Sequence, residues 1–97
     1  MNQKIVSKFK IGDLVRLNLA DPSRLTDFQA DLQMYYSDHD IGERAFDVLD
    51  AALLNPKQKW TIKSIEENTF NGNSLYECRV GRIAAPWLFE EEDLLSI

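Results

Sequence analysis

The chain has 97 residues, of which 44% are hydrophobic and 10% aromatic, and its formal net charge at pH 7 is −5. This length and composition allow one domain with a modest packed core, and they exclude a chain that is disordered throughout. The negative charge disfavours direct binding to nucleic acid, because duplex affinity comes largely from bases that neutralise phosphates. The single cysteine, Cys78, excludes an intrachain disulfide, and we expect a cytoplasmic protein.

No segment of the sequence is predicted to enter a membrane. Lysine, glutamate or aspartate interrupts every apolar run before the ~20 residues that a membrane-spanning helix needs. The start of the chain, residues 1–8, also lacks the apolar run of a signal peptide. We therefore expect a soluble protein without a membrane partner.

The first predicted strand follows a turn near the start of the chain. Gly12 and Asp13 form a turn signal. In residues 14–19, apolar side chains then alternate with Arg16 and Asn18, which is the period of a half-buried strand. One face of this strand should therefore belong to the core.

A helix is predicted directly after this strand. Asp21 can cap a helix, and Pro22 is tolerated in the first turn, where its missing amide hydrogen has no cost. Over residues 23–36, apolar side chains recur at three- and four-residue steps, which places them on one side of a helix.

A second helix is predicted after a short polar turn at residues 37–40. Its apolar side chains recur over residues 41–53. Asn55 is expected to end it as a left-handed cap residue, because Pro56 cannot continue a helix. We expect the apolar faces of the two helices to pack on the sheet or on each other.

Strand patterns return after the helices. Alternation predicts one strand from Trp60 and another over residues 76–80. The sequence Asn-Gly-Asn at residues 71–73 predicts the turn between them, because Asn and Gly accept the positive φ of tight hairpins. The remaining segments are a strand broken near Pro86 (81–89), a short helical turn (90–93) and a strand that closes the sheet (94–97).

Negative charge is concentrated in one internal stretch. Residues 21–55 hold eight acids and two bases, a net charge of −6, while the rest of the chain has a net charge of +1. A surface of one sign determines which partners a small domain can approach. A solvated helical surface is the simpler interpretation, and a binding surface is the more specific one. Helical spacing sorts the acids into two stripes: Asp27, Asp31 and Asp38 on the first helix, and Glu43, Asp47 and Asp50 on the second.

Two aromatic positions are expected to remain partly exposed beside these stripes. They are Trp87, which follows Pro86, and Tyr35 or Tyr36 near the end of the first helix. The other aromatic residues are assigned mostly to the core. The predicted partner-binding residues are Asp27, Asp31, Tyr35, Asp38, Glu43, Asp47, Asp50 and Trp87.

The sequence contains no recognisable catalytic, metal-binding or cofactor-binding motif. His39 lies between two aspartates, but counting from Asp38 places Gly42 fifth and Leu49 twelfth, whereas a calcium loop needs Gly sixth and Glu twelfth. A solvated turn is therefore favoured over a metal site. Cys78 falls on the inward side of a predicted strand, where a buried and inert thiol is expected. Neighbouring acids near the end of the chain imply no pocket.

Four short segments of the chain carry a family resemblance: residues 9–17, 60–65, 76–80 and 91–97. Together they resemble small SH3-like barrel proteins, many of which occur in bacteria and phages. In that group a Gly-Asp turn begins the first long strand, a middle hairpin follows, and an acidic turn ending in Asp-Leu precedes the last strand. The resemblance specifies a fold better than a function.

The resemblance implies one mainly β domain of the α+β class over residues 1–97. A five-stranded, SH3-like small barrel would carry a two-helix insertion, at about residues 21–56, between its first and second strands. Compact barrels of this kind usually carry only a loop at that point. The usual peptide-binding groove is therefore not transferred to this chain.

These features predict a non-enzymatic protein-interaction module of bacterial or phage type that uses the acidic helical surface. Its partner would be a protein, and a basic nucleic-acid-binding protein would fit the charge. One alternative is an acidic inhibitor that imitates nucleic acid, as anti-CRISPR proteins do. A second is an RNA or DNA reader that uses the basic residues outside the helices.

Overall fold

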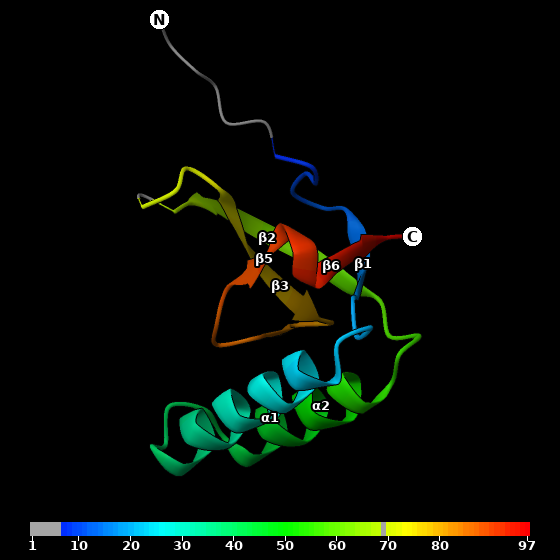
Figure 1. Cartoon of the computed structure of the whole chain (residues 1–97). Coiled ribbons are helices and arrows are strands. Elements are labelled where there is room, and N and C mark those ends of the chain that lie inside the picture. Colours follow the sequence, from blue (N-terminus) through cyan, green and yellow to red (C-terminus); the bar gives the residue numbers. More distant parts are fainter. Residues whose placement is uncertain (1–6, 69) are drawn as a thin grey trace, which may run out of the picture.

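The computed structural model describes residues 7–68 and 70–97. Within these ranges six strands form one antiparallel sheet, and two helices lie side by side below it (Figure 1). Both helices come between the first and second strands, as predicted. The elements are β1 (Leu14–Leu17), α1 (Pro22–Ser37), α2 (Glu43–Leu54), β2 (Trp60–Glu67), β3 (Ser74–Val80), β4 (Ile83–Ala84), β5 (Phe89–Glu90), the 3-10 turn η1 (Glu91–Asp93) and β6 (Leu94–Ser96).

The sheet is open, with strand order β4-β3-β2-β1-β6 and with β5 paired to β3. The α+β class is therefore confirmed, but the predicted number of five strands is wrong. Pro86 has no amide hydrogen and separates β4 from β5, which adds a strand. Among the described residues no ladder joins β6 to β4 or β5, so the sheet does not close into a barrel.

The first strand ends earlier than predicted, because Asn18 leaves the sheet pattern. Its Nδ2 donates to the carbonyl oxygen of Glu92 at 3.1 Å, and its Oδ1 accepts from the amide of Ala20 at 3.2 Å. These bonds turn the chain from β1 toward α1. The strand therefore covers only Leu14–Leu17.

The start of α1 matches the prediction. The Asp21 Oδ1 atom accepts hydrogen bonds from the amide and the hydroxyl of Ser23, at 3.0 and 2.8 Å. Pro22 occupies the first helical position, where the missing amide hydrogen leaves no bond unmade. The Asp-Pro pair therefore defines where this helix begins.

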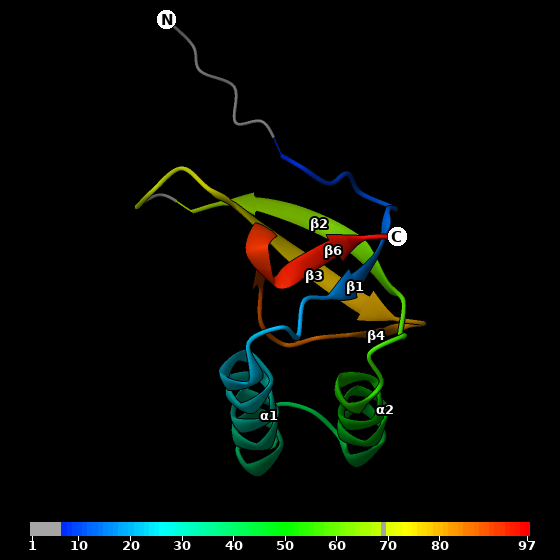
Figure 2. The same ribbon diagram turned by 45° about the vertical axis from the view of Figure 1, so that its right-hand side comes forward.

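The end of α1 is a Schellman motif built on a histidine. The amide of Asp40 donates to the Tyr35 carbonyl, and the amide of His39 donates to the Tyr36 carbonyl. His39 has φ 61°, in the left-handed region that normally favours glycine. This motif turns the chain toward α2, which Figure 2 shows antiparallel to α1.

The predicted left-handed conformation of Asn55 is wrong. Asn55 has φ −106° and ψ 103°, an extended conformation. The ring of Pro56 restricts the preceding residue to extended conformations, which explains the difference. The Asn55 side chain instead accepts from the amide of Lys57 at 3.0 Å. The residue that adopts the left-handed conformation in this region is His39.

The hydrophobic core lies between the inner face of the sheet and the two helices. Phe89 is its centre: its ring lies 5.2 Å from that of Phe28 on α1 and 5.6 Å from that of Trp60 on β2. The two helices thus pack both on the sheet and on each other, as expected. The fully buried side chains include Trp60, Tyr76, Phe89, Leu32, Leu49, Leu53, Ile62 and Leu94.

The left-handed histidine leads to a stability prediction. A side chain in this conformation costs roughly 1 kcal/mol relative to glycine, so His39→Gly should raise the free energy of unfolding by about that amount. His39→Ala removes the imidazole but keeps a Cβ atom, and it should give at most a small part of the gain. Urea denaturation of the three proteins measures the difference. Equal stability of the Gly and Ala variants would contradict this explanation.

Candidate functional site

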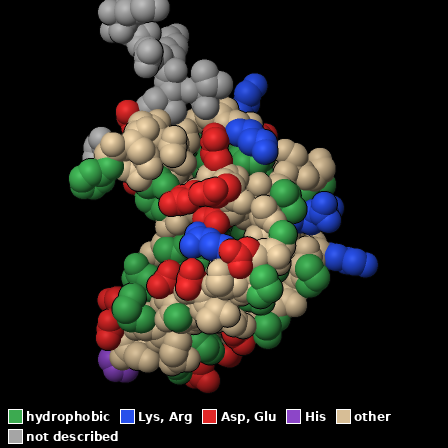
Figure 3. Space-filling view, viewed as in Figure 1, with side chains coloured by type: hydrophobic (Ala, Val, Ile, Leu, Met, Phe, Trp, Pro, Cys, Tyr) green, Lys and Arg blue, Asp and Glu red, His purple; other side chains and the backbone are tan. Residues whose placement is uncertain are grey.

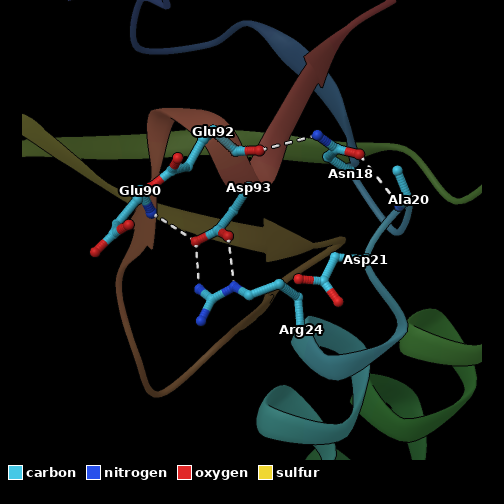
Figure 4. Close-up of a pocket in the computed structure, with 7 residues that line it drawn as sticks. All are labelled: Asn18, Ala20, Asp21, Arg24, Glu90, Glu92 and Asp93. Atoms are coloured by element: carbon cyan, nitrogen blue, oxygen red, sulfur yellow. Dashed lines mark hydrogen bonds and ion pairs between the residues drawn. The ribbon is translucent and has the colours of Figure 1, made fainter.

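Arg24 on α1 and Asp93 in η1 form the ion pair that joins the helices to the sheet. Nε of Arg24 donates to Oδ1 of Asp93 at 2.9 Å, and Nη2 donates to Oδ2 at 2.8 Å (Figure 4). Oδ2 also accepts from the amide of Glu90 at 3.0 Å. The Asp93 side chain is only 3% exposed. Such a two-pronged contact is among the stronger kinds of charged hydrogen bond, and it raises the pKa of Arg24.

A pocket of about 360 Å³ opens beside this ion pair. Four carboxyl groups and one guanidinium line it, which gives the pocket a negative character. Two nitrogens of Arg24 already donate hydrogen bonds to Asp93, so the pocket suits a cationic group better than an anion. Its lining residues are Asn18, Ala20, Asp21, Arg24, Glu90, Glu92 and Asp93 (Figure 4).

The pKa values of two carboxyl groups of this pocket are shifted in opposite directions. A hydrogen bond from the Glu92 side chain raises the pKa of Glu90, and desolvation and the charge of Asp93 add to the effect. The two hydrogen bonds from Ser23 lower the pKa of Asp21. Glu90 and Glu92 touch each other, so they do not stand about 5 to 10 Å apart as the carboxyl groups of glycosidases do.

Glu91 fastens the start of the described chain to the sheet. Its Oε1 atom accepts from the amide of Lys8 at 2.7 Å and from the hydroxyl of Tyr76 at 2.7 Å. These two bonds lower the pKa of Glu91. Burial, followed by the bond to Glu91, raises the pKa of Tyr76.

The predicted acidic stripes lie on α1 and α2, except that α1 ends at Ser37 and Asp38 is its C-cap residue. Asp27 is exposed and lies 3.5 Å from Arg24, its partner one helical turn earlier. The other five stripe acids form no ion pair with any described base. Figure 3 shows acidic side chains around the helices and at the centre of the same view. These five residues are Asp31 and Asp50, which are half-buried, and Asp38, Glu43 and Asp47, which are exposed.

The two predicted aromatic contacts are partly exposed, as the sequence predicts. Trp87 is half-buried and stacks on Phe28, with ring centres 5.8 Å apart and an interplanar angle of 9°. Tyr35 is also half-buried. The most exposed aromatic residue of the described chain is Phe70, at 97%, whereas the sequence predicts that most aromatic residues outside positions 35, 36 and 87 belong to the core. The position of Phe70 beside the Asn-Gly-Asn turn indicates this exposure in the sequence, because a hairpin tip lies beyond the sheet.

Cys78 and His39 are the remaining residues that the sequence analysis considered for catalysis or metal binding. Cys78 is fully buried on β3, and burial raises its pKa to about 12. His39 is exposed at the turn between the helices. Within residues 7–68 and 70–97, no three His, Cys, Asp or Glu side chains are arranged to hold a metal ion.

The pocket around Arg24 was missed by the sequence analysis, which stated that the acids near the chain end imply no pocket. Asp21 and Glu90 are far apart in the sequence, and long-range contacts such as the ion pair between Arg24 and Asp93 and the bond from Asn18 to Glu92 bring them together. One sequence signal existed: Arg24 is a rare base in a strongly acidic segment.

The comparisons with known proteins do not assign the chain to a family. No protein-family model matches the chain, and no match was found among curated proteins or solved structures. Neither helix of the described chain is long and apolar enough to span a membrane. The site is therefore interpreted from its own geometry.

The ion pair leads to a prediction about stability. Arg24→Ala leaves the buried Asp93 carboxylate without a cation, so the free energy of unfolding should fall by about 2 to 3 kcal/mol. This is slightly less than for a fully buried pair, because the Arg24 side chain is 37% exposed. Asp27→Asn is the control, since it removes only the exposed partner and should cost less than about 0.5 kcal/mol. Urea denaturation that gives both variants the same loss would refute the assignment.

Glu91 leads to a prediction about pH. Its folded pKa lies below the ordinary glutamate value of 4.5, so its carboxylate stabilises the fold above that pH and loses this effect as the pH falls through the folded pKa. Glu91→Gln keeps an acceptor but does not titrate. The stability advantage of the wild type over this variant should therefore shrink as the pH falls below about 4.5. Thermal melts at several pH values measure it, with the exposed residue Glu66 changed to Gln as control. Parallel curves for wild type and Glu91→Gln would count against this role.

Proposed function

We propose that the protein is a non-enzymatic interaction module that binds a basic protein through an acidic surface on α1, α2 and η1. The observation that carries this proposal is the set of five stripe acids that have no ion-pair partner among the described bases. Their helices are held by buried side chains such as Phe28 and Leu49, so the charges sit on a supported scaffold. We call these residues and the pocket carboxylates the acidic surface.

The cost of this arrangement supports a role in binding. Asp27 and Asp31 are four residues apart on one helix, where like charges destabilise the helix by a few tenths of a kcal/mol. Asp47 and Asp50 are three apart on the next helix. Glu43 is the exception, because it lies in the first turn of α2 and interacts favourably with the helix dipole. A basic partner would offset the repulsion within these two pairs of aspartates.

The SH3-like relationship and the bacterial or phage origin belong to the same proposal. The order of β1 to β4, the last strand beside β1 and the 3-10 turn before it are consistent with an opened SH3-like barrel. The helical pair occupies the place of a loop between β1 and β2. In this proposal the helices, and not a barrel groove, provide the binding surface in the cytoplasm.

A second candidate function is inhibition by imitation of nucleic acid. Aspartates four residues apart on a helix lie about 6 Å apart along its axis, so Asp27 and Asp31 give α1 a short row of two carboxylates. A protein that binds nucleic acid offers a basic channel for such a row. In this case the captured partner would release its nucleic acid when the module binds.

Affinity capture from cells of the source organism, after nuclease treatment, tests the proposal. The bait is compared with a variant in which Asp27 and Asp47, both exposed, become lysine. The control changes Glu66 and Glu67 on β2 to lysine, which gives the same change in net charge. Wild type and control should retain basic proteins that the helix variant loses.

The recovery of these proteins should also fall steeply as salt rises from about 0.1 to 0.5 M, because screening weakens contacts between exposed charges. Capture of the same proteins by the helix variant, or recovery that does not depend on salt, would refute a charge-based interface. Release of bound nucleic acid from the captured protein would select the second candidate function.

A further inference from the structure

Three large apolar side chains lie exposed on the face of the sheet that points away from the core. Leu14 is 49% exposed, Leu95 41% and Ile97 59%. Val15 pairs with Ser96 across β1 and β6, so their neighbours Leu14 and Ile97 face each other. Leu95 is two residues from Ile97 and shares its face, because strand side chains alternate. We call these three residues the outer-sheet patch.

Basic side chains surround the outer-sheet patch. Arg16 pairs with Leu95, and Thr61 pairs both with Leu14 and with Arg79, so both arginines lie on this face. The bases of this face outnumber its acids by two. The charged residues of the outer face are Arg16, Lys59, Lys63 and Arg79, with Glu66 paired to Leu75 and with Glu77 paired to Lys63 at 3.6 Å. Figure 3 shows several Lys and Arg side chains along the right side of the molecule.

The patch also borders a free sheet edge. Within the described residues β6 pairs only with β1, and its other side carries no strand. An exposed edge can accept an extended segment through backbone hydrogen bonds. β6 has three residues, so these bonds alone would be few, and the neighbouring side chains would have to supply much of the affinity.

We infer that this edge and the outer-sheet patch bind an extended, acidic segment of a partner protein whose apolar and acidic side chains lie on the same face of the added strand, the face that continues the outer-sheet patch. Apolar side chains of the added strand would cover Leu95 and Ile97, and its carboxylates would reach Arg16. This surface is distinct from the acidic surface and has the opposite charge. A chain with both surfaces can hold two partners of unlike chemistry.

Two other occupants fit this face less well. Nucleic acid would gain from aromatic side chains on which bases stack, and the outer-sheet patch has only aliphatic ones. A second copy of the chain would bring two basic faces together when its β6 edges pair. Five of its 16 acidic residues lie on α1 and α2, and helices cannot add to a sheet as a strand.

The test uses a short synthetic peptide in which leucine and glutamate take turns along one strand face, with serine at each position between them, and a matched peptide with lysine in place of glutamate. Amide shifts in NMR spectra should be saturable with the acidic peptide and should lie in β1 and β6. Leu95→Glu or Arg16→Glu should weaken this binding by about tenfold or more. Leu54→Glu is the matched control, because Leu54 is an exposed leucine on α2, and this variant should bind the peptide as the wild type does.

Several results would overturn the inference. They are absence of saturable shifts, equal binding of the lysine peptide, and equal binding by the Leu95→Glu variant. Stronger binding of single-stranded oligothymidine to the same residues would assign the face to nucleic acid. Dimers in sedimentation that Leu95→Glu abolishes would assign it to a second copy. The Asp27 and Asp47 lysine variant should bind the peptide normally, so the two proposals fail independently.

Discussion

The buried contact between Arg24 and Asp93 is the constraint on which the rest of the structure depends. The helical pair leaves the sheet after β1 and returns at β2, and this contact joins its first turn to the opposite end of the chain. Asp93 also accepts from the Glu90 amide and so shapes η1. Because the carboxylate is buried, any movement of α1 away from η1 would leave a charge without water or partner. The ion pair therefore fixes where the acidic surface points.

Strand and helix periodicity together sort the charges of this small molecule. The apolar faces of α1 and α2 meet the inner side of the sheet, so Asp27, Glu43 and Asp47 are exposed to solvent, whereas Asp31 and Asp50 are half-buried. The outer face of the sheet, which no helix covers, carries Arg16, Arg79 and aliphatic side chains. The core thus separates a negative surface from a mildly positive and apolar one. This separation makes an adaptor between two partners physically reasonable.

Much of the fold could be predicted because several of its signals are local. The Asp-Pro cap, the Asn-Gly-Asn turn and the break near Pro86 depend only on neighbouring residues and their allowed dihedral angles. The prediction for Asn55 failed even at this level, because the effect of the following proline on its backbone outweighs its own preference. The stacking of Trp87 on Phe28 could not be predicted for another reason: Phe28 lies far away in the sequence.

The sequence by itself determined the elements and their charge, because helix and strand periods are properties of neighbouring residues. It determined that acids would occupy the solvent side of both helices. Only the tertiary structure decided that the sheet stays open, that Arg24 meets Asp93 beside a negative pocket, and that Leu14, Leu95 and Ile97 come together. These features join residues that are distant along the chain. Their positions follow from packing and strand register, which no local pattern specifies.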